Sequence, residues 1–151
     1  MKLYEECIRY KTCEMIGMML NVSNQKIRSY KEINNQQNSY FIECCMTSFS
    51  FGRRSGHTSG AIEYIKNNKH AYLVVHSEYR KTDIIRSQHL SQDVIGRIIS
   101  LSARKEVIFS LFAGIKDIEL IFDAVMEEDN IYKFVNNSTF LHNVSALCKI
   151  G

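Results

Sequence analysis

The sequence predicts a three-layer α/β protein, in which helices cover both faces of a mainly parallel sheet. Short continuous apolar runs, typical of strands buried on both faces, alternate with segments of helical periodicity. A loop with two glycines also joins an apolar stretch to a helical one. The chain shows no internal repeat, linker or low-complexity tract, so we expect residues 1–151 to form a single domain.

The length and composition of the chain are those of a globular protein with one domain. The length of 151 residues suffices for one sizeable core, and 45% apolar with 23% charged residues is ordinary for a globular domain. A net charge of +3 is too small to indicate nucleic-acid binding by itself.

The cysteines and the N-terminal segment predict where in the cell the protein is located. Five cysteines without a CxxC pair, and histidines outside zinc-ligand spacings, indicate packed thiols in a reducing compartment. Charges interrupt the first 20 residues, and no apolar run is long enough to span a bilayer. We therefore expect a cytoplasmic protein without a membrane partner.

Residues 1–39 are expected to form an N-terminal helical segment. Apolar side chains from Lys2 to Leu20 recur at helical spacing, and the polar residues 21–24 indicate a break. Ser23 is a candidate cap for a second short helix, and the asparagine- and glutamine-rich residues 31–39 indicate a loop.

Residues 40–151 are expected to form the α/β core. The expected strands are 40–51, 71–76, 107–112, 118–122 and 146–150. The expected helices are 58–67, 90–99 and a segment from Ile131 onward, whereas 77–86 reads as a polar connection.

The loop FGRRSGHTS, residues 51–59, has the context of a phosphate-binding loop. An apolar strand precedes it, glycines allow backbone N–H groups to close around an anion, and a helix follows. The candidate phosphate-binding residues are Gly52, Arg53, Arg54, Ser55, Gly56, His57, Thr58 and Ser59. The G-x-x-x-x-G-K-[ST] pattern is missed at its first glycine, which is Phe51, and at its lysine, which is His57.

A second part of the candidate site is Asp123. It directly follows the apolar run IELIF, and so is expected at the carboxyl end of a buried strand. A carboxylate there, with the Thr58 hydroxyl beside it, is the donor set expected for a magnesium ion that accompanies nucleotide phosphates.

Together GRRSGHTS, AYLVVH and IELIFD resemble the ATPase domain of the viral terminase large subunit, a P-loop NTPase that packages DNA. The resemblance covers about residues 40–129. It implies ATP or another nucleoside triphosphate with Mg²⁺ as ligands. It also implies that Arg53 is a catalytic arginine on the γ-phosphate side, and that Thr58 and Asp123 bind the metal.

The sequence departs from that family at two positions. His57, with an ordinary pKa of about 6.5, replaces a permanently charged lysine. Ala124 stands where the family has the glutamate that activates water, and loss of a positioned base costs about 10²–10⁴-fold in rate. Both departures predict poor hydrolysis.

Simpler interpretations remain open for each motif. FGRRSGHTS is also compatible with a polar surface turn, and Asp123 with a helix cap. Arg80, Lys81 and Arg86, near Tyr79, form a basic cluster that suits nucleic-acid phosphates, although a solvated face is the favoured interpretation.

Two functional hypotheses follow. The first is a degenerate P-loop protein, viral and linked to DNA transactions, that binds nucleotide and hydrolyses it slowly or not at all. The second is a binding module without nucleotide, which uses the same scaffold to engage a protein or nucleic-acid partner.

Overall fold

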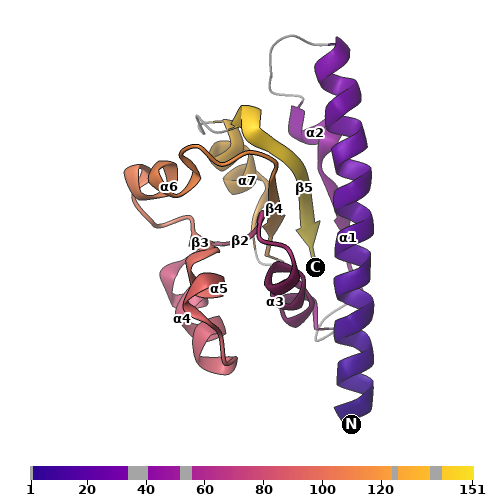
Figure 1. The fold of residues 1–151 in the computed structure, drawn as a ribbon, viewed down its shortest axis with the longest axis vertical. Helices are drawn as coiled ribbons and strands as arrows, with labels where there is room; N and C mark the ends of the chain where they lie inside the picture. Colours follow the sequence, from indigo (N-terminus) through magenta and orange to yellow (C-terminus); the bar gives the residue numbers. More distant parts are fainter. Residues whose placement is uncertain (1, 34–40, 52–55, 124–125, 137–140) are drawn as a thin grey trace.

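A five-stranded, all-parallel sheet forms the centre of the computed structural model (Figure 1). The structure describes residues 2–33, 41–51, 56–123, 126–136 and 141–151. The strands are β1 (Thr47–Phe49), β2 (Ala71–Val75), β3 (Ile98–Ser100), β4 (Ile118–Phe122) and β5 (Val144–Ile150). Their order across the sheet is β1-β5-β4-β2-β3. The apolar runs predicted for β2, β4 and β5 are confirmed as buried strands.

Helices cover both faces of this sheet, which confirms the three-layer α/β class. On one face lie α3 (His57–Asn67), α4 (Glu78–Ser87) and α5 (Gln92–Gly96). On the other lie α2 (Phe41–Cys45), α6 (Lys105–Phe112) and α7 (Glu128–Asn136), and a short 3-10 turn (Leu141–Asn143) precedes β5. Alternate residues of the strands face the two layers, as in Leu73 and Val74 of β2.

The N-terminal segment is a single helix, α1 (Lys2–Ile33), so the predicted break at residues 21–24 is wrong. Figure 1 shows α1 as a long rod beside β5 and α3. Ser23 does not cap a helix; it is buried within one. Its hydroxyl donates to the Cys45 carbonyl at 2.7 Å and accepts the Leu147 N–H at 2.8 Å. Tertiary partners thus make a polar residue compatible with the helix interior.

Helix α1 also completes the hydrogen bonding of β5. Strand β1 pairs with Cys148–Ile150, and in the described part of the chain no strand lies beside the earlier residues of β5 on that side. Ser23 takes the Leu147 N–H there, and the Asn24 side-chain amide donates to the Ser145 carbonyl at 2.9 Å. Side chains of α1 therefore form hydrogen bonds with β5 that a neighbouring strand would otherwise form.

The strand expected over residues 40–51 is mostly wrong. Its first part is α2, and only Thr47–Phe49 is strand. Phe41, Ile42 and Cys45 are buried together because their spacing places them on one side of a helical turn. A short helix thus uses an apolar stretch that sequence alone reads as extended.

The strand expected over residues 107–112 is also wrong, because these residues belong to α6. Ile108 and Phe112 are buried, whereas Val107 and Leu111 are 52% and 39% exposed. Residues four positions apart lie on the same face of an α-helix, whose period is about 3.6 residues.

The helix expected over residues 90–99 is shorter and is followed by a strand. It comprises α5, and Ile98–Ser100 form β3. The polar connection expected over 77–86 is helix α4, and the Ser77 hydroxyl caps it by accepting the Arg80 N–H at 3.2 Å.

Candidate functional site

The carboxyl edge of the sheet contains a topological switch point, where the connections from two neighbouring strands lead to opposite sides of the sheet. Strands β2 and β4 are neighbours, but the chain leaves β2 toward β3 on one side and leaves β4 toward β5 on the other. In open α/β sheets the crevice at such a point is the usual ligand site. The segments that follow β2 and β4 at this edge are Ser77–Arg80 and Asp123.

Arg80 joins Asp123 to Thr58 at this edge. Its Nε donates to Asp123 Oδ2 at 2.9 Å, and one of its terminal nitrogens donates to Thr58 Oγ1 at 3.0 Å. The Asp123 side chain is fully buried, whereas Arg80 is 27% exposed. A buried carboxylate requires a charged or hydrogen-bonding partner, and Arg80 supplies both.

Local backbone structure positions each of these three residues. The Asp123 N–H donates to the Val74 carbonyl at 3.0 Å, which ties the end of β4 to β2. Ser77 caps α4, so Arg80 lies in the first turn of that helix. Thr58 is the second residue of α3, the helix that follows β1.

Gly56 starts α3 in a left-handed conformation, with φ 72° and ψ 23°. Few other residues adopt this conformation without strain, so the glycine suits the end of the loop. Its carbonyl accepts the Gly60 N–H at 2.8 Å, which begins the helical ladder. The first N–H groups of any α-helix lack partners within the helix and attract anions.

His57 has an internal role that the sequence did not predict. Its Nε2 accepts the Phe51 N–H at 3.0 Å, and its ring stacks on that of Phe51 with an angle of 6° between the planes. The side chain is buried, and this burial lowers its pKa, against an opposing effect of the Asp123 charge. The imidazole is therefore a neutral acceptor, not a replacement for the lysine cation.

The predicted site residues are only partly described. Gly52, Arg53, Arg54, Ser55 and Ala124 lie outside the described residues. Gly56, His57, Thr58 and Ser59 lie at the start of α3. The structure brings Thr58 and Asp123 to one place through their shared partner.

Arg80 is the residue whose role sequence reasoning missed. We expected it on a solvated basic face, and this expectation is wrong because its guanidinium binds a fully buried carboxylate. One signal was present in the sequence. Arg80 follows the capping Ser77 by three residues, and a cation in the first turn of a helix is disfavoured by the helix dipole unless it has a partner.

The residues present do not fit the expected magnesium ion. Asp123 Oδ2 and Thr58 Oγ1, the two predicted metal ligands, already accept hydrogen bonds from one guanidinium. Within the described ranges, no group of three histidine, cysteine, aspartate or glutamate side chains is arranged to hold a metal. A cation is present between the two oxygens, but it belongs to the protein.

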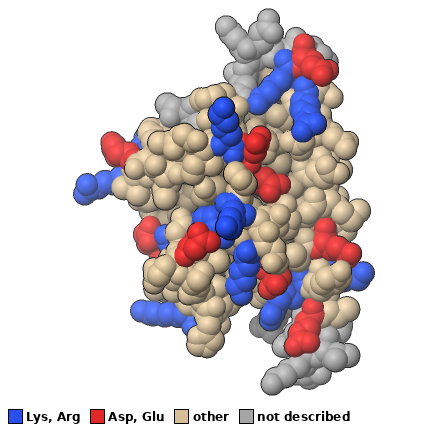
Figure 2. Space-filling view, in the orientation of Figure 1, with Lys and Arg blue, Asp and Glu red and all other residues tan. Residues whose placement is uncertain are grey.

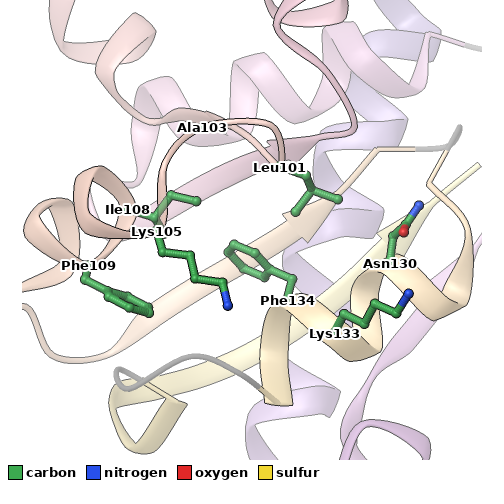
Figure 3. A pocket seen from close by; sticks show the side chains of 8 residues that line it. All are labelled: Leu101, Ala103, Lys105, Ile108, Phe109, Asn130, Lys133 and Phe134. Carbon is green, nitrogen blue, oxygen red and sulfur yellow. The ribbon is translucent and has the colours of Figure 1, made fainter.

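A separate cavity of about 340 Å³ lies between α6 and α7, on the opposite face of the sheet from α3 and α4 (Figure 3). Its lining consists of Leu101, Ala103, Lys105, Ile108, Phe109, Asn130, Lys133 and Phe134. Figure 3 shows the Lys105 side chain extending toward the Phe134 ring, with Lys133 on the α7 side. Among the described residues, neither lysine forms an ion pair.

Charges of both signs are mixed on the face shown in Figure 2. Blue and red side chains alternate there, and the described part of this face has no broad area of one sign. Such a surface does not favour non-specific attraction of nucleic acid over a wide area.

No helix in the described ranges is long and apolar enough to cross a lipid bilayer. All five cysteines are free thiols. Burial raises the pKa of Cys148 to about 12, which makes this thiol a packed apolar group instead of a reactive one.

Comparisons of the chain with protein-family models, with curated proteins and with solved structures found no match.

Proposed function

We propose that this protein is a degenerate P-loop domain that binds the phosphates of a nucleoside triphosphate and hydrolyses it slowly or not at all. The phosphates would lie between the loop after β1 and Asp123, the residue that follows β4. One observation carries the proposal: Thr58 and Asp123, predicted from separate segments to share a site, both bind Arg80 at the carboxyl edge of the sheet.

Two further features support phosphate as the ligand. Gly56, in the left-handed region, begins a helix whose first N–H groups suit an anion. The site also adjoins the topological switch point between β2 and β4, where α/β proteins bind nucleotides. Gly52, Arg53, Arg54 and Ser55 remain candidate contacts from the loop itself.

Poor hydrolysis is part of the proposal. The neutral His57 ring contacts Phe51 and so does not supply the charge of the usual loop lysine. Ala124 provides no carboxylate to activate water. The resemblance to terminase ATPase domains extends the proposal to a viral protein of the host cytoplasm that acts in DNA transactions such as packaging.

Isothermal titration of the protein with ATP tests the proposal. We expect saturable binding with little release of inorganic phosphate over the same period. In Gly56→Asp, a carboxylate at the start of α3 would face the bound phosphates, and we expect a loss of affinity of at least about tenfold.

The chain offers a matched control for this variant. Gly114 has a similar backbone conformation, with φ 75°, and a Cβ there would meet no atom within 4 Å. Gly114→Asp should therefore keep the affinity of the unmodified protein. Equal binding by both variants, or no binding of ATP by the unmodified protein, would refute the proposal.

A binding module without nucleotide is the second candidate, and the cavity between α6 and α7 favours it. Its apolar lining and two lysines suit an acidic group carried by a protein or nucleic-acid partner. Lys105→Glu with Lys133→Glu would abolish binding of such a partner. If nucleotide binding instead accounts for the function, this double variant should leave the affinity for ATP unchanged.

A further inference from the structure

Arg80 occupies the place that the donor set of the site offers to a metal ion. Its guanidinium reaches both Asp123 Oδ2 and Thr58 Oγ1, at 2.9 and 3.0 Å. A third contact, to Asp83 Oδ2, is long at 3.4 Å, and Asp83 is 59% exposed. The buried end of the guanidinium is therefore firmly held, while its exposed end is weakly held.

We infer that Arg80 is the permanent cation of the phosphate site, and that the protein binds a polyphosphate group without a divalent metal. The inference rests on the proposed function, because it assumes that phosphate binds at this edge of the sheet. It goes further in stating which cation neutralises the phosphates.

Electrostatics and geometry oppose a metal at this position. Mg²⁺ requires near-octahedral oxygen ligands at about 2.0–2.1 Å. Here the two candidate oxygens are committed to a guanidinium, and a dication beside that group would be repelled by it. Displacing Arg80 would also remove an ion-pair partner of the buried carboxylate of Asp123.

The same arginine retains capacity to bind phosphate. A guanidinium has five N–H donors, and the described residues Asp123, Thr58 and Asp83 accept three of them. The weak contact to exposed Asp83 is readily exchanged for a phosphate oxygen. Arginine is well suited to this role, because its planar fork matches phosphate geometry and stays charged at all physiological pH values.

Titration of the unmodified protein with ATP and with inorganic pyrophosphate, in Mg²⁺ and in excess EDTA, tests the inference. We expect the affinity in EDTA to equal or exceed that in Mg²⁺. Binding that occurs in Mg²⁺ and is lost in EDTA would overturn the inference but leave the proposed function intact. Absence of binding in both buffers would refute the proposed function, and the inference with it.

Variants of Arg80 sharpen the test. Arg80→Ala removes the guanidinium from Asp123 and Thr58, so we expect binding to become dependent on Mg²⁺, with affinity in Mg²⁺ at least about tenfold above that in EDTA. Arg80→Lys keeps the charge, and its binding should stay insensitive to EDTA. Equal sensitivity to EDTA in both variants would contradict the assigned role of Arg80.

A measurement with metal alone begins with the unmodified protein, so its expected result does not depend on the folding of a variant. Mn²⁺ added to the unmodified protein should keep the electron paramagnetic resonance signal of the free ion. Saturable loss of that signal, reversed in Asp123→Asn, would show that a metal reaches the carboxylate and would overturn the inference.

Discussion

His57 joins the two ends of the loop that follows β1. The Phe51 N–H lies at the beginning of this loop, and its acceptor, His57 Nε2, lies at the end. The ring of Phe49 also contacts the imidazole, with centroids 5.8 Å apart. A histidine at this position therefore holds Phe51 beside the start of α3, because a neutral ring both accepts a hydrogen bond and packs against aromatic rings.

The lowered pKa of His57 predicts how stability depends on pH. The unfolded chain, with a histidine pKa of about 6.5, binds a proton before the folded protein does. The contribution of His57 to the unfolding free energy is therefore complete above about pH 6.5. It is lost as the pH falls to the lower, folded pKa, with a slope of at most about 1.4 kcal/mol per pH unit.

Urea denaturation of the unmodified protein and of His57→Gln, from about pH 7.5 to about pH 5.5, checks this slope. Glutamine presents an acceptor near the position of Nε2 but does not titrate, so the variant should show a flatter dependence on pH. His89→Gln, at an exposed residue, should keep the original slope. A variant of His57 with unchanged slope would contradict the argument.

Single residues also show why the site was only partly predictable. The place of Asp123 at the carboxyl end of a buried strand followed from the apolar run before it, and the role of Thr58 followed from the glycine loop. Their link through Arg80 was not predicted, because it depends on the pairing of β2 with β4 in three dimensions. Arg80 lies 43 residues from Asp123 in the sequence, and local sequence patterns do not predict a pair so far apart.

Helices α1 and α3 approach closely at one glycine. A Cβ on Gly60 would lie 2.5 Å from Thr12 Cγ2 and 2.6 Å from Thr12 Cβ, and Thr12 is fully buried. No side chain larger than that of glycine fits there without movement of a helix. The contact sets the distance between α1 and the helix that begins the candidate site.

Gly60→Ala should destabilise the protein by about 1–3 kcal/mol, because overpacking outweighs the higher helix propensity of alanine. Gly96→Ala is the matched control, since its Cβ would meet no atom within 4 Å. That variant should have unchanged stability or gain up to about 1 kcal/mol. Thermal denaturation of both variants provides the measurement, and equal melting temperatures would refute the close approach.

At the level of elements, continuous apolar runs predicted strands correctly where both faces of the strand are buried, as in Ala71–Val75 and Ile118–Phe122. They misled where a helix uses the same residue types. In α6 the β-branched and aromatic residues suggested a strand, although the buried residues Ile108 and Phe112 are four positions apart, which is a helical spacing. Propensity is a local preference, and packing against the sheet overrode it.

Helix α1 connects the two halves of the core. Ile16 and Leu20 pack in the layer that contains α3, whereas Ile27 packs in the layer that contains α2 and α7. One helix thus contributes to both faces of the sheet, which makes separate melting of either layer unfavourable.

We therefore expect the protein to unfold in one cooperative transition. Tyr72 is buried in the core and the sequence has no tryptophan, so tyrosine fluorescence contains a signal from the core. Far-ultraviolet circular dichroism reports the helices. The two curves should coincide, and the calorimetric and van't Hoff enthalpies should agree. Loss of helix signal at a lower temperature than the tyrosine change would show that α1 melts independently.

The sheet's borders have a consequence for behaviour at high concentration. Both outermost strands, β1 and β3, are three residues long, and Ser23 and Asn24 of α1 hydrogen-bond to β5 where β1 leaves it uncovered. A strand from another molecule would therefore have few unpaired backbone groups with which to hydrogen-bond. Edge-to-edge aggregation of the native protein is disfavoured for this reason. The same helix that packs the core also protects the molecule from its neighbours.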